Sequence, residues 1–473
     1  MIGLKFYNKY RIIVIIFTII TFFLSLYTNI SDGYRFIPVL ILLYFFLFVF
    51  NSRLHKYSKE YCGMFILNAL MFVRYSVAIF FILINGDYWA PPYSGVIPMQ
   101  SSCEIAIFYM IIELFFIFVI ISLFSDKIYN KKDFNFEKKF DNSNQENKYR
   151  VVFPIVMILS ILLIFVFPSS FIPDFNKFMN SSFSNDEIVI TNGFVDIISY
   201  CFKIIVAFKI IDSFIKKYEK RNKFIYVVFS YLTIGLYILF STSSSRLNMI
   251  LPFVFFILIT KDIFKKKGLV LLLISFVILI YSIMTITVYK NSWLFSNGSN
   301  IKTFTRVLSS QIQEYTSNIR PIAQGIEATS VYKQSYTVTT FINDFVGSIP
   351  VLNHYTNPRN RSNVYYNAYI LNNNGKTTPL IMPLVCISSI FFSPAFCWLL
   401  TCMCILIMMF IDRNKKYDHY NDFLEKYINI YLVFIFAACI YCNSQIIVGR
   451  LITKALPVYI LYFLNKKILV VRK

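Results

Sequence analysis

The sequence predicts an all-α polytopic membrane protein with about twelve transmembrane helices and one large outward-facing loop between the ninth and tenth. Hydrophobic residues make up 57% of the 473 residues and charged residues only 15%, whereas soluble proteins average about 25% charged residues. Apolar runs near the length that a helix needs to cross a bilayer recur along the chain. One long polar stretch, from Lys290 to Pro379, interrupts them.

The spans can be placed in order from these apolar runs. The first, Ile12–Leu26, follows Lys5 and Lys9 and has no small-residue cleavage site after it, so we expect an uncleaved span. The later spans are expected at Phe36–Phe50, Tyr61–Leu83, Cys103–Phe124, Val151–Phe167, Gly193–Ser213, Phe224–Phe240, Leu247–Ile259, Leu269–Val288, Ile390–Ile411, Ile428–Cys442 and Leu451–Leu464. The apolar piece Leu380–Ser389 is expected to enter the membrane and return, or to lie along its surface.

Lysine and arginine set the expected orientation, because cytoplasmic flanks carry most of them. Every second flank is rich in Lys and Arg, whereas the alternate connection Asn85–Ser102 has none. This alternation predicts cytoplasmic N- and C-termini in a bacterial cytoplasmic (inner) membrane, with the long loop facing outward. The expected organisation is residues 1–288 with nine spans, 289–380 as the large periplasmic or extracellular loop, and 381–473 with three spans.

The excess of Lys and Arg does not indicate binding to nucleic acid, although it gives a formal net charge of +22. The basic side chains lie mostly between spans, where they fix topology and meet anionic headgroups of the membrane lipid. No nucleotide-binding or hydrolase motif is present, and no Cys/His cluster has zinc spacing. We therefore expect no metal, no cofactor and no nucleic-acid partner.

A hydroxyl-rich turn precedes the eighth span. It reads Ser-Thr-Ser-Ser-Ser-Arg and ends with Ser244, Ser245 and Arg246. An arginine stays charged and offers planar paired donors, and the following helix would aim its first amides at the same point. An outward arginine also goes against the positive-inside bias. The turn therefore predicts a phosphate or pyrophosphate site, with anchoring of the span at the headgroups as the alternative.

The long loop contains the other candidate residues. His354 is the one histidine outside the cytoplasmic flanks, and a positioned imidazole can take a proton from a sugar hydroxyl. Glu314 and Asp344 are the candidate acids, and the base could be any of these three residues. The arginines expected to bind substrate in this loop are Arg306, Arg320, Arg359 and Arg361.

Arg74 lies near the middle of the third span, where a charge costs about 2.5–3.5 kcal/mol on insertion scales. It should therefore face the bundle interior. Two interpretations stay open: a substrate-binding arginine, or a structural pair with an acid such as Glu104 or Glu113.

Taken together, the layout resembles the Wzy-type O-antigen or oligosaccharide repeat-unit polymerases and is similar to the related O-antigen ligases. The resemblance lies in the span number, the large late outer loop, the short turn ending in Arg246, and the loop His354 with its neighbouring arginines. It implies a metal-independent membrane glycosyltransferase. The substrate would be an undecaprenyl-pyrophosphate-linked oligosaccharide, polymerised into O-antigen, capsule or exopolysaccharide on the outer face of the membrane. It also implies a chain-length regulator as a candidate partner.

Two other functions remain open. A flippase or transporter of lipid-linked oligosaccharides would explain the many spans and buried charges, but not a folded outer loop. An O-antigen ligase would use the same donor with a different acceptor, and the sequence does not separate it from a polymerase.

Overall fold

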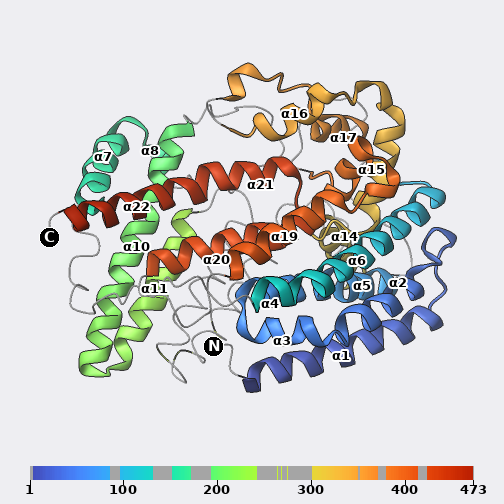
Figure 1. Ribbon diagram of the computed structural model, residues 1–473, viewed down its shortest axis with the longest axis horizontal. Coiled ribbons are helices and arrows are strands. Elements are labelled where there is room, and N and C mark those ends of the chain that lie inside the picture. Colours follow the sequence, from blue (N-terminus) through green and yellow to red (C-terminus); the bar gives the residue numbers. More distant parts are fainter. Residues whose placement is uncertain are drawn as a thin grey trace. The chain divides into compact units, whose positions relative to one another are not determined.

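The computed structural model describes residues 4–85, 96–130, 152–171, 193–241, 301–349, 352–370, 380–413 and 423–471, with residues 264, 268 and 274. The regular elements within these ranges are all helices (Figure 1). Among the described residues, six helical stretches are long and apolar enough to cross a membrane: Tyr7–Tyr27, Asp32–Val49, Cys62–Asn85, Gln100–Tyr129, Pro394–Arg413 and Ser444–Leu464. The chain is thus an all-α protein with several apolar helices suited to a multi-pass membrane protein.

The other six expected spans are not among these stretches. Three apolar helices of intermediate length, Pro154–Val166, Phe224–Tyr237 and Tyr427–Tyr441, fall on the expected fifth, seventh and eleventh spans. The expected sixth span lies in a longer helix, Gly193–Arg221. The expected eighth and ninth spans lie outside the described residues, except for residues 274 and, between the two spans, 264 and 268.

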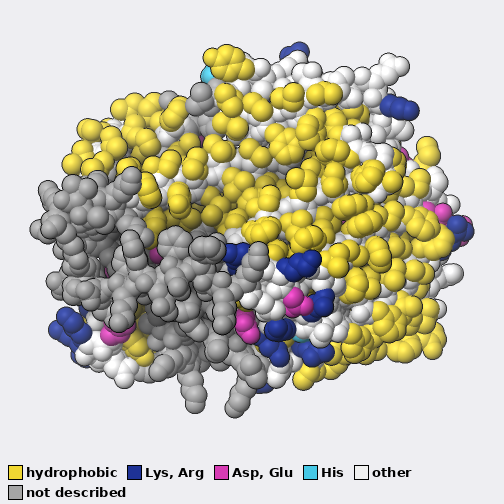
Figure 2. Space-filling view, viewed as in Figure 1, with side chains coloured by type: hydrophobic (Ala, Val, Ile, Leu, Met, Phe, Trp, Pro, Cys, Tyr) yellow, Lys and Arg dark blue, Asp and Glu magenta, His cyan; other side chains and the backbone are white. Residues whose placement is uncertain are grey.

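Apolar side chains on these helices point outward as well as inward. Ile12 is 56% exposed, Phe46 61% and Phe410 52%. Figure 2 shows hydrophobic side chains over much of the described part of the face that it draws. Water would disfavour so much exposed apolar surface, whereas lipid chains would cover it.

The helices form two compact units. Unit 1 consists of Met1–Phe136, Ser299–His419 and Leu432–Leu451; unit 2 consists of Glu137–Gly298, Tyr420–Tyr431 and Ile452–Lys473. The segment expected as a separate outer loop is thus grouped, from Ser299 onward, with the N-terminal helices.

Unit 1 holds most of the described helices. Its first half contains α1 (Leu4–Tyr27), η1 (Asp32–Tyr34), α2 (Ile37–Tyr44), η2 (Phe45–Val49), α3 (Ser52–Glu60), α4 (Cys62–Phe72), η3 (Val73–Val77), α5 (Ala78–Asn85) and α6 (Gln100–Tyr129). Its second half contains α14 (Ile301–Tyr315), α15 (Ile319–Val331), η6 (Lys333–Ser335), α16 (Val338–Val346), η7 (Leu352–Tyr355), α17 (Ser362–Ile370), α18 (Leu384–Phe392), η8 (Pro394–Phe396), α19 (Leu399–Arg413), η9 (Ala438–Tyr441) and α21 (Ser444–Arg450).

The spans of unit 1 share two ends. At one end, which we call the basic end, lie Arg53, Lys56, Lys59, Lys127 and Arg413. There Asp412 of α19 accepts from the backbone N–H groups of Gly63 (2.9 Å) and Met64 (3.3 Å), at the start of α4. At the opposite end, η1 packs against the start of α6. The Cys62–Asn85 helix therefore runs from the basic end to the opposite end, and α6 runs back.

Unit 2 contains α7 (Val152–Val166), α8 (Pro168–Phe171), α10 (Gly193–Arg221), α11 (Phe224–Ser241), the first part of α20 (Phe423–Ala437), most of η10 (Leu451–Ala455) and α22 (Leu456–Val471). Asn222, with φ 47°, turns the chain between α10 and α11, which pack along each other. Val156 and Ile205 are buried together, with Phe202 and Leu461 packed against them. Apolar contact between α7, α10 and α22 thus holds this unit.

Candidate functional site

The candidate residues between positions 301 and 370 lie on helices of unit 1 or in the turn that precedes α17. An apolar pattern predicts a helix here, and the structure has α14 there; the pattern runs through Phe304, Val307, Leu308, Ile312, Tyr315 and Ile319. A second helix, α15, follows after only three residues, with Asn318 as its N-cap. Since α14 packs against α5 and α15 against α6, this segment reaches the membrane-spanning helices directly (Figure 1).

Arg320 and Glu314 form a buried ion pair between these two helices. Arg320 is fully buried, and its Nη2 donates to Glu314 Oε1, while its Nη1 donates to the hydroxyl of Ser310. Nη2 also donates to the backbone carbonyl of Ser310 at 3.1 Å. The guanidinium thus fastens the end of α14 to the start of α15. Glu314, expected as a catalytic acid, is bound to an arginine that was expected to bind substrate.

Arg74 is buried in the middle of its span and paired with Glu113 of α6. The distance from Arg74 Nη1 to Glu113 Oε2 is 2.9 Å, and each side chain is 1% exposed. Thr401 of α19 donates its hydroxyl to the other Glu113 oxygen at 2.7 Å. Glu113 is one of the two acids expected for this pair; the other, Glu104, binds Arg35 instead.

The backbone around Arg74 is also special. Residues Val73–Val77 form one turn of π-helix inside the span, a feature that occurs frequently at functional sites. The side-chain amide of Asn318 donates to the carbonyl of Arg74 at 2.7 Å. Through this bond the Arg74–Glu113 pair adjoins the turn between α14 and α15, which directly precedes Arg320.

Asp344 of α16 is a fully buried acid. Its Oδ1 accepts from the backbone N–H of Ser362 and from Nε2 of Gln445, each at 2.9 Å. Its Oδ2 is buried without a hydrogen-bond partner among the described residues. Burial raises the pKa of Asp344, opposed by the bonds from Ser362 and Gln445 and by the positive charge of Arg361.

Arg361, His354 and Arg359 lie together on the surface of the segment. Arg361 Nη2 donates to the carbonyl of Gly347 at 3.1 Å and to Asn353 Oδ1 at 3.0 Å. Asn353 precedes His354 in η7, so Arg361 holds the turn that presents the imidazole. His354 and Arg359 are exposed.

The structure therefore divides the candidate residues into two groups. Arg74, Arg320 and Glu314 lie in the interior of unit 1, and His354, Arg359 and Arg361 lie near its surface. Arg306 is half-buried on α14. Ser244, Ser245 and Arg246 lie outside the described residues.

Two further polar residues of unit 1, Glu327 and Asn443, make contacts that the sequence did not predict. Glu327 of α15 accepts from the backbone N–H of Met99 and from the hydroxyl of Tyr369, each at 2.6 Å. Asn443 donates to Asn363 Oδ1 at 3.3 Å, just before α21 begins. A polar run, Asn443-Ser444-Gln445, between two apolar helices was the available signal for the latter contact.

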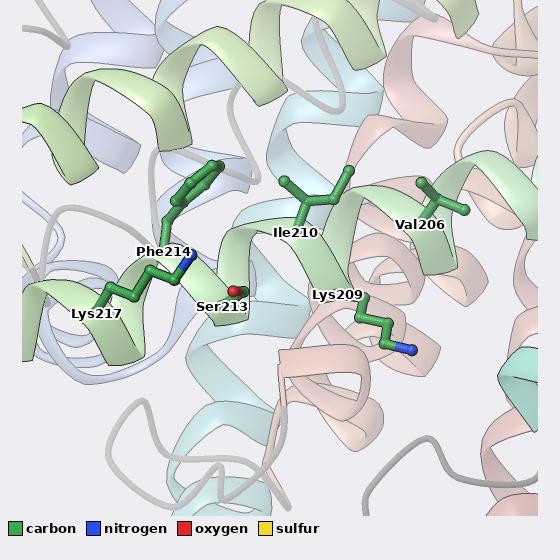
Figure 3. A pocket seen from close by; sticks show the side chains of 6 residues that line it. All are labelled: Val206, Lys209, Ile210, Ser213, Phe214 and Lys217. Atoms are coloured by element: carbon green, nitrogen blue, oxygen red, sulfur yellow. The ribbon is translucent and has the colours of Figure 1, made fainter.

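An open groove of about 350 Å³ lies on unit 2, along one side of α10. Figure 3 shows its lining, in which Val206, Ile210 and Phe214 alternate with Lys209, Ser213 and Lys217. The Lys217 ammonium lies 5.8 Å from the centre of the Phe214 ring. None of the candidate residues lines this groove, so it belongs to a helix face and not to the candidate site.

Searches with family models, among curated proteins and among solved structures found no match to this chain. The chemistry of these side chains therefore carries the functional proposal.

Proposed function

We propose that the protein is a membrane glycosyltransferase that polymerises polyprenyl-pyrophosphate-linked oligosaccharide units on the outer face of a bacterial cytoplasmic membrane. It would have about twelve spans and cytoplasmic termini. The observation that supports this most is the folded segment 301–370, which places His354, Arg359 and Arg361 on one surface of unit 1. A loop that only joined two spans would have no need of a buried arginine held by its own ion pair, Arg320–Glu314.

The residue types fit the chemistry of such a transfer. The leaving group is a pyrophosphate, whose growing negative charge calls for guanidinium donors such as Arg246, Arg359 and Arg361. The acceptor is a sugar hydroxyl, whose proton needs one base, and His354 is exposed where the sugar part of a lipid-linked unit could reach it. Arg74, Arg320 and Glu314 would then shape the interior that supports this surface.

The test is the surface glycan ladder of a strain that lacks this chain and is complemented with variants. The deletion should leave one repeat unit on its acceptor, and wild type should restore the ladder. Arg246→Ala and His354→Ala, at matched expression, should behave like the deletion, since each removes a proposed participant in the transfer.

A neighbouring residue provides a matched control. Tyr355 lies next to His354 in η7 and is 86% exposed, so Tyr355→Ala changes the same turn without removing the imidazole. It should keep the ladder. Equal loss of polymer from His354→Ala and Tyr355→Ala would exclude His354 as the base.

A lipid-linked oligosaccharide flippase is the second candidate, favoured by the charged pair Arg74–Glu113 in the middle of the spans. The same deletion separates the two functions. A flippase would leave no repeat unit on the outer surface and would trap lipid-linked units in the inner leaflet. A ligase deletion would leave polymer on the lipid carrier without transfer to its acceptor.

A further inference from the structure

The helices α14 and α15 begin and end at the same end of unit 1. Near the start of α14, the side-chain amide of Asn85 donates to the carbonyl of Thr305 at 3.3 Å. Asn85 is the last residue of its span, so this contact lies at the end opposite the basic end. α14 therefore starts where the span of Arg74 finishes.

The turn after α14 lies much deeper. Asn318 reaches the carbonyl of Arg74, which is midway along the span Cys62–Asn85. Asn85 lies eleven positions after Arg74, which corresponds to roughly 16 Å of helix, or about half of a 30 Å hydrocarbon core. Thr316 also lies eleven positions after Thr305, so α14 covers a similar length.

α15 then runs back to the end of unit 1 where α14 starts. Gln324 donates to the carbonyl of Val96 at 2.9 Å, and Glu327 accepts from the backbone N–H of Met99. Val96 and Met99 immediately precede α6, at the end where α14 also starts.

We propose that α14 and α15 form a re-entrant hairpin: it enters the membrane from the end opposite the basic end, turns at Thr316–Asn318 beside Arg74, and leaves at the same end. This inference is independent of the glycosyl transfer proposed above. The expected loop between the ninth and tenth spans is then partly a membrane-embedded element.

The backbone N–H groups of the turn are bonded within the protein, as irregular backbone inside a bilayer requires. The N–H of Thr316 bonds the carbonyl of Ile312 at 2.9 Å, and the N–H of Asn318 bonds that of Gln313 at 3.0 Å. Asn318 Oδ1 accepts from the N–H of Ile319 at 2.8 Å. Thr316, Ser317 and Asn318 are all buried, so the turn faces protein and not lipid.

Depth can be measured with spin labels in the full chain reconstituted into liposomes. Tyr315, at the end of α14 next to the turn, is 46% exposed, and Val331, at the end of α15, is 62% exposed. Labels at Tyr315→Cys and Val331→Cys would report the deep and shallow ends of the hairpin. Ile16→Cys, 53% exposed within the first span, serves as a reference for the membrane interior.

The hairpin predicts that the label at position 315 collides more with oxygen, which dissolves in lipid, than with a water-soluble nickel complex, as at position 16. The label at position 331 should show the reverse. The nine native cysteines are buried except Cys404, which is partly exposed, so labelled wild type supplies the background.

Equal access of the nickel complex to positions 315 and 331 would overturn the proposal, because the segment would then lie wholly outside the membrane. If Tyr315→Cys fails to fold, Tyr315→Trp with brominated lipids gives the same depth by fluorescence quenching. Quenching only by lipids brominated near the headgroup would equally overturn it.

Discussion

Arg74 and Glu113 lie 2.9 Å apart in the middle of two membrane helices, each side chain 1% exposed. Removing one partner would leave the other charge buried alone, which typically costs about 3–5 kcal/mol. We expect Glu113→Ala and Arg74→Ala each to lower thermal stability in detergent by that order. A double variant, Arg74→Met with Glu113→Leu, should recover much of the loss.

The pair Arg35–Glu104 is the matched control, because its side chains are 62% and 22% exposed. Glu104→Ala should change stability by only about 0–1 kcal/mol. If Glu113→Ala were as mild as Glu104→Ala, the buried pair would not hold the two helices.

Gly63 should tolerate no side chain. A Cβ at this position would lie 2.6 Å from Val433 Cγ1 and 2.7 Å from Asp412 Oδ2. Gly63→Ala should therefore destabilise unit 1 by about 1–3 kcal/mol, the usual cost of overpacking. Denaturation followed by intrinsic fluorescence would measure it.

Gly235 in α11 provides the opposite case, since a Cβ there would meet nothing within 4 Å. Gly235→Ala should be neutral or stabilise by up to about 1 kcal/mol, because alanine is the better helix former. Similar losses for both substitutions would show that crowding at Gly63 is not the cause.

Glu327 joins α15 to the start of α6 and to α17. Glu327→Ala would remove the acceptor of the Met99 N–H and of the Tyr369 hydroxyl, and each lost hydrogen bond should cost about 0.5–1.5 kcal/mol. Tyr369→Phe removes one of these bonds and should cost less. Tyr355→Phe, on an exposed tyrosine, should leave the unfolding temperature unchanged.

Asp344 should make stability depend on pH. Burial raises the pKa of Asp344 in the folded protein. The stability that this carboxyl contributes is therefore fully present below the pKa of an unfolded aspartate, about 3.9. It is lost as the pH rises through the folded pKa. Wild type should therefore lose stability relative to Asp344→Asn as the pH rises from about 4 toward neutrality. The amide oxygen of the substituted side chain can still accept from Ser362 and Gln445. A difference between the two proteins that stays constant over this range would contradict the prediction.

Composition was enough to predict the class of fold, because apolar runs of membrane length leave few alternatives. The central position of Arg74 in its span predicted an interior side chain and left open a pair with Glu104 or Glu113; the structure pairs it with Glu113. The apolar spacing from Phe304 predicted a helix, and α14 confirms it.

The end of that helix could not be predicted. The spacing continued to Ile319, but the helix stops at Tyr315 and Ser317 turns with φ 48°, a conformation that serine rarely adopts. The contact that fixes this turn joins Asn318 to a carbonyl 244 residues away. Local pattern carries no information about such a partner, and the same holds for Asp344 and Gln445.

The interior position of Arg74 also has a consequence for synthesis of the chain. The ribosome makes the span Cys62–Asn85 before Glu113, long before Asn318, and longer still before Thr401. The span of this arginine is therefore made well before Asn318, which bonds its carbonyl, and before Thr401, which bonds its partner Glu113. The early spans can thus complete their packing only after the late ones are made. Nascent chains cut short before residue 401 should be prone to degradation at the membrane.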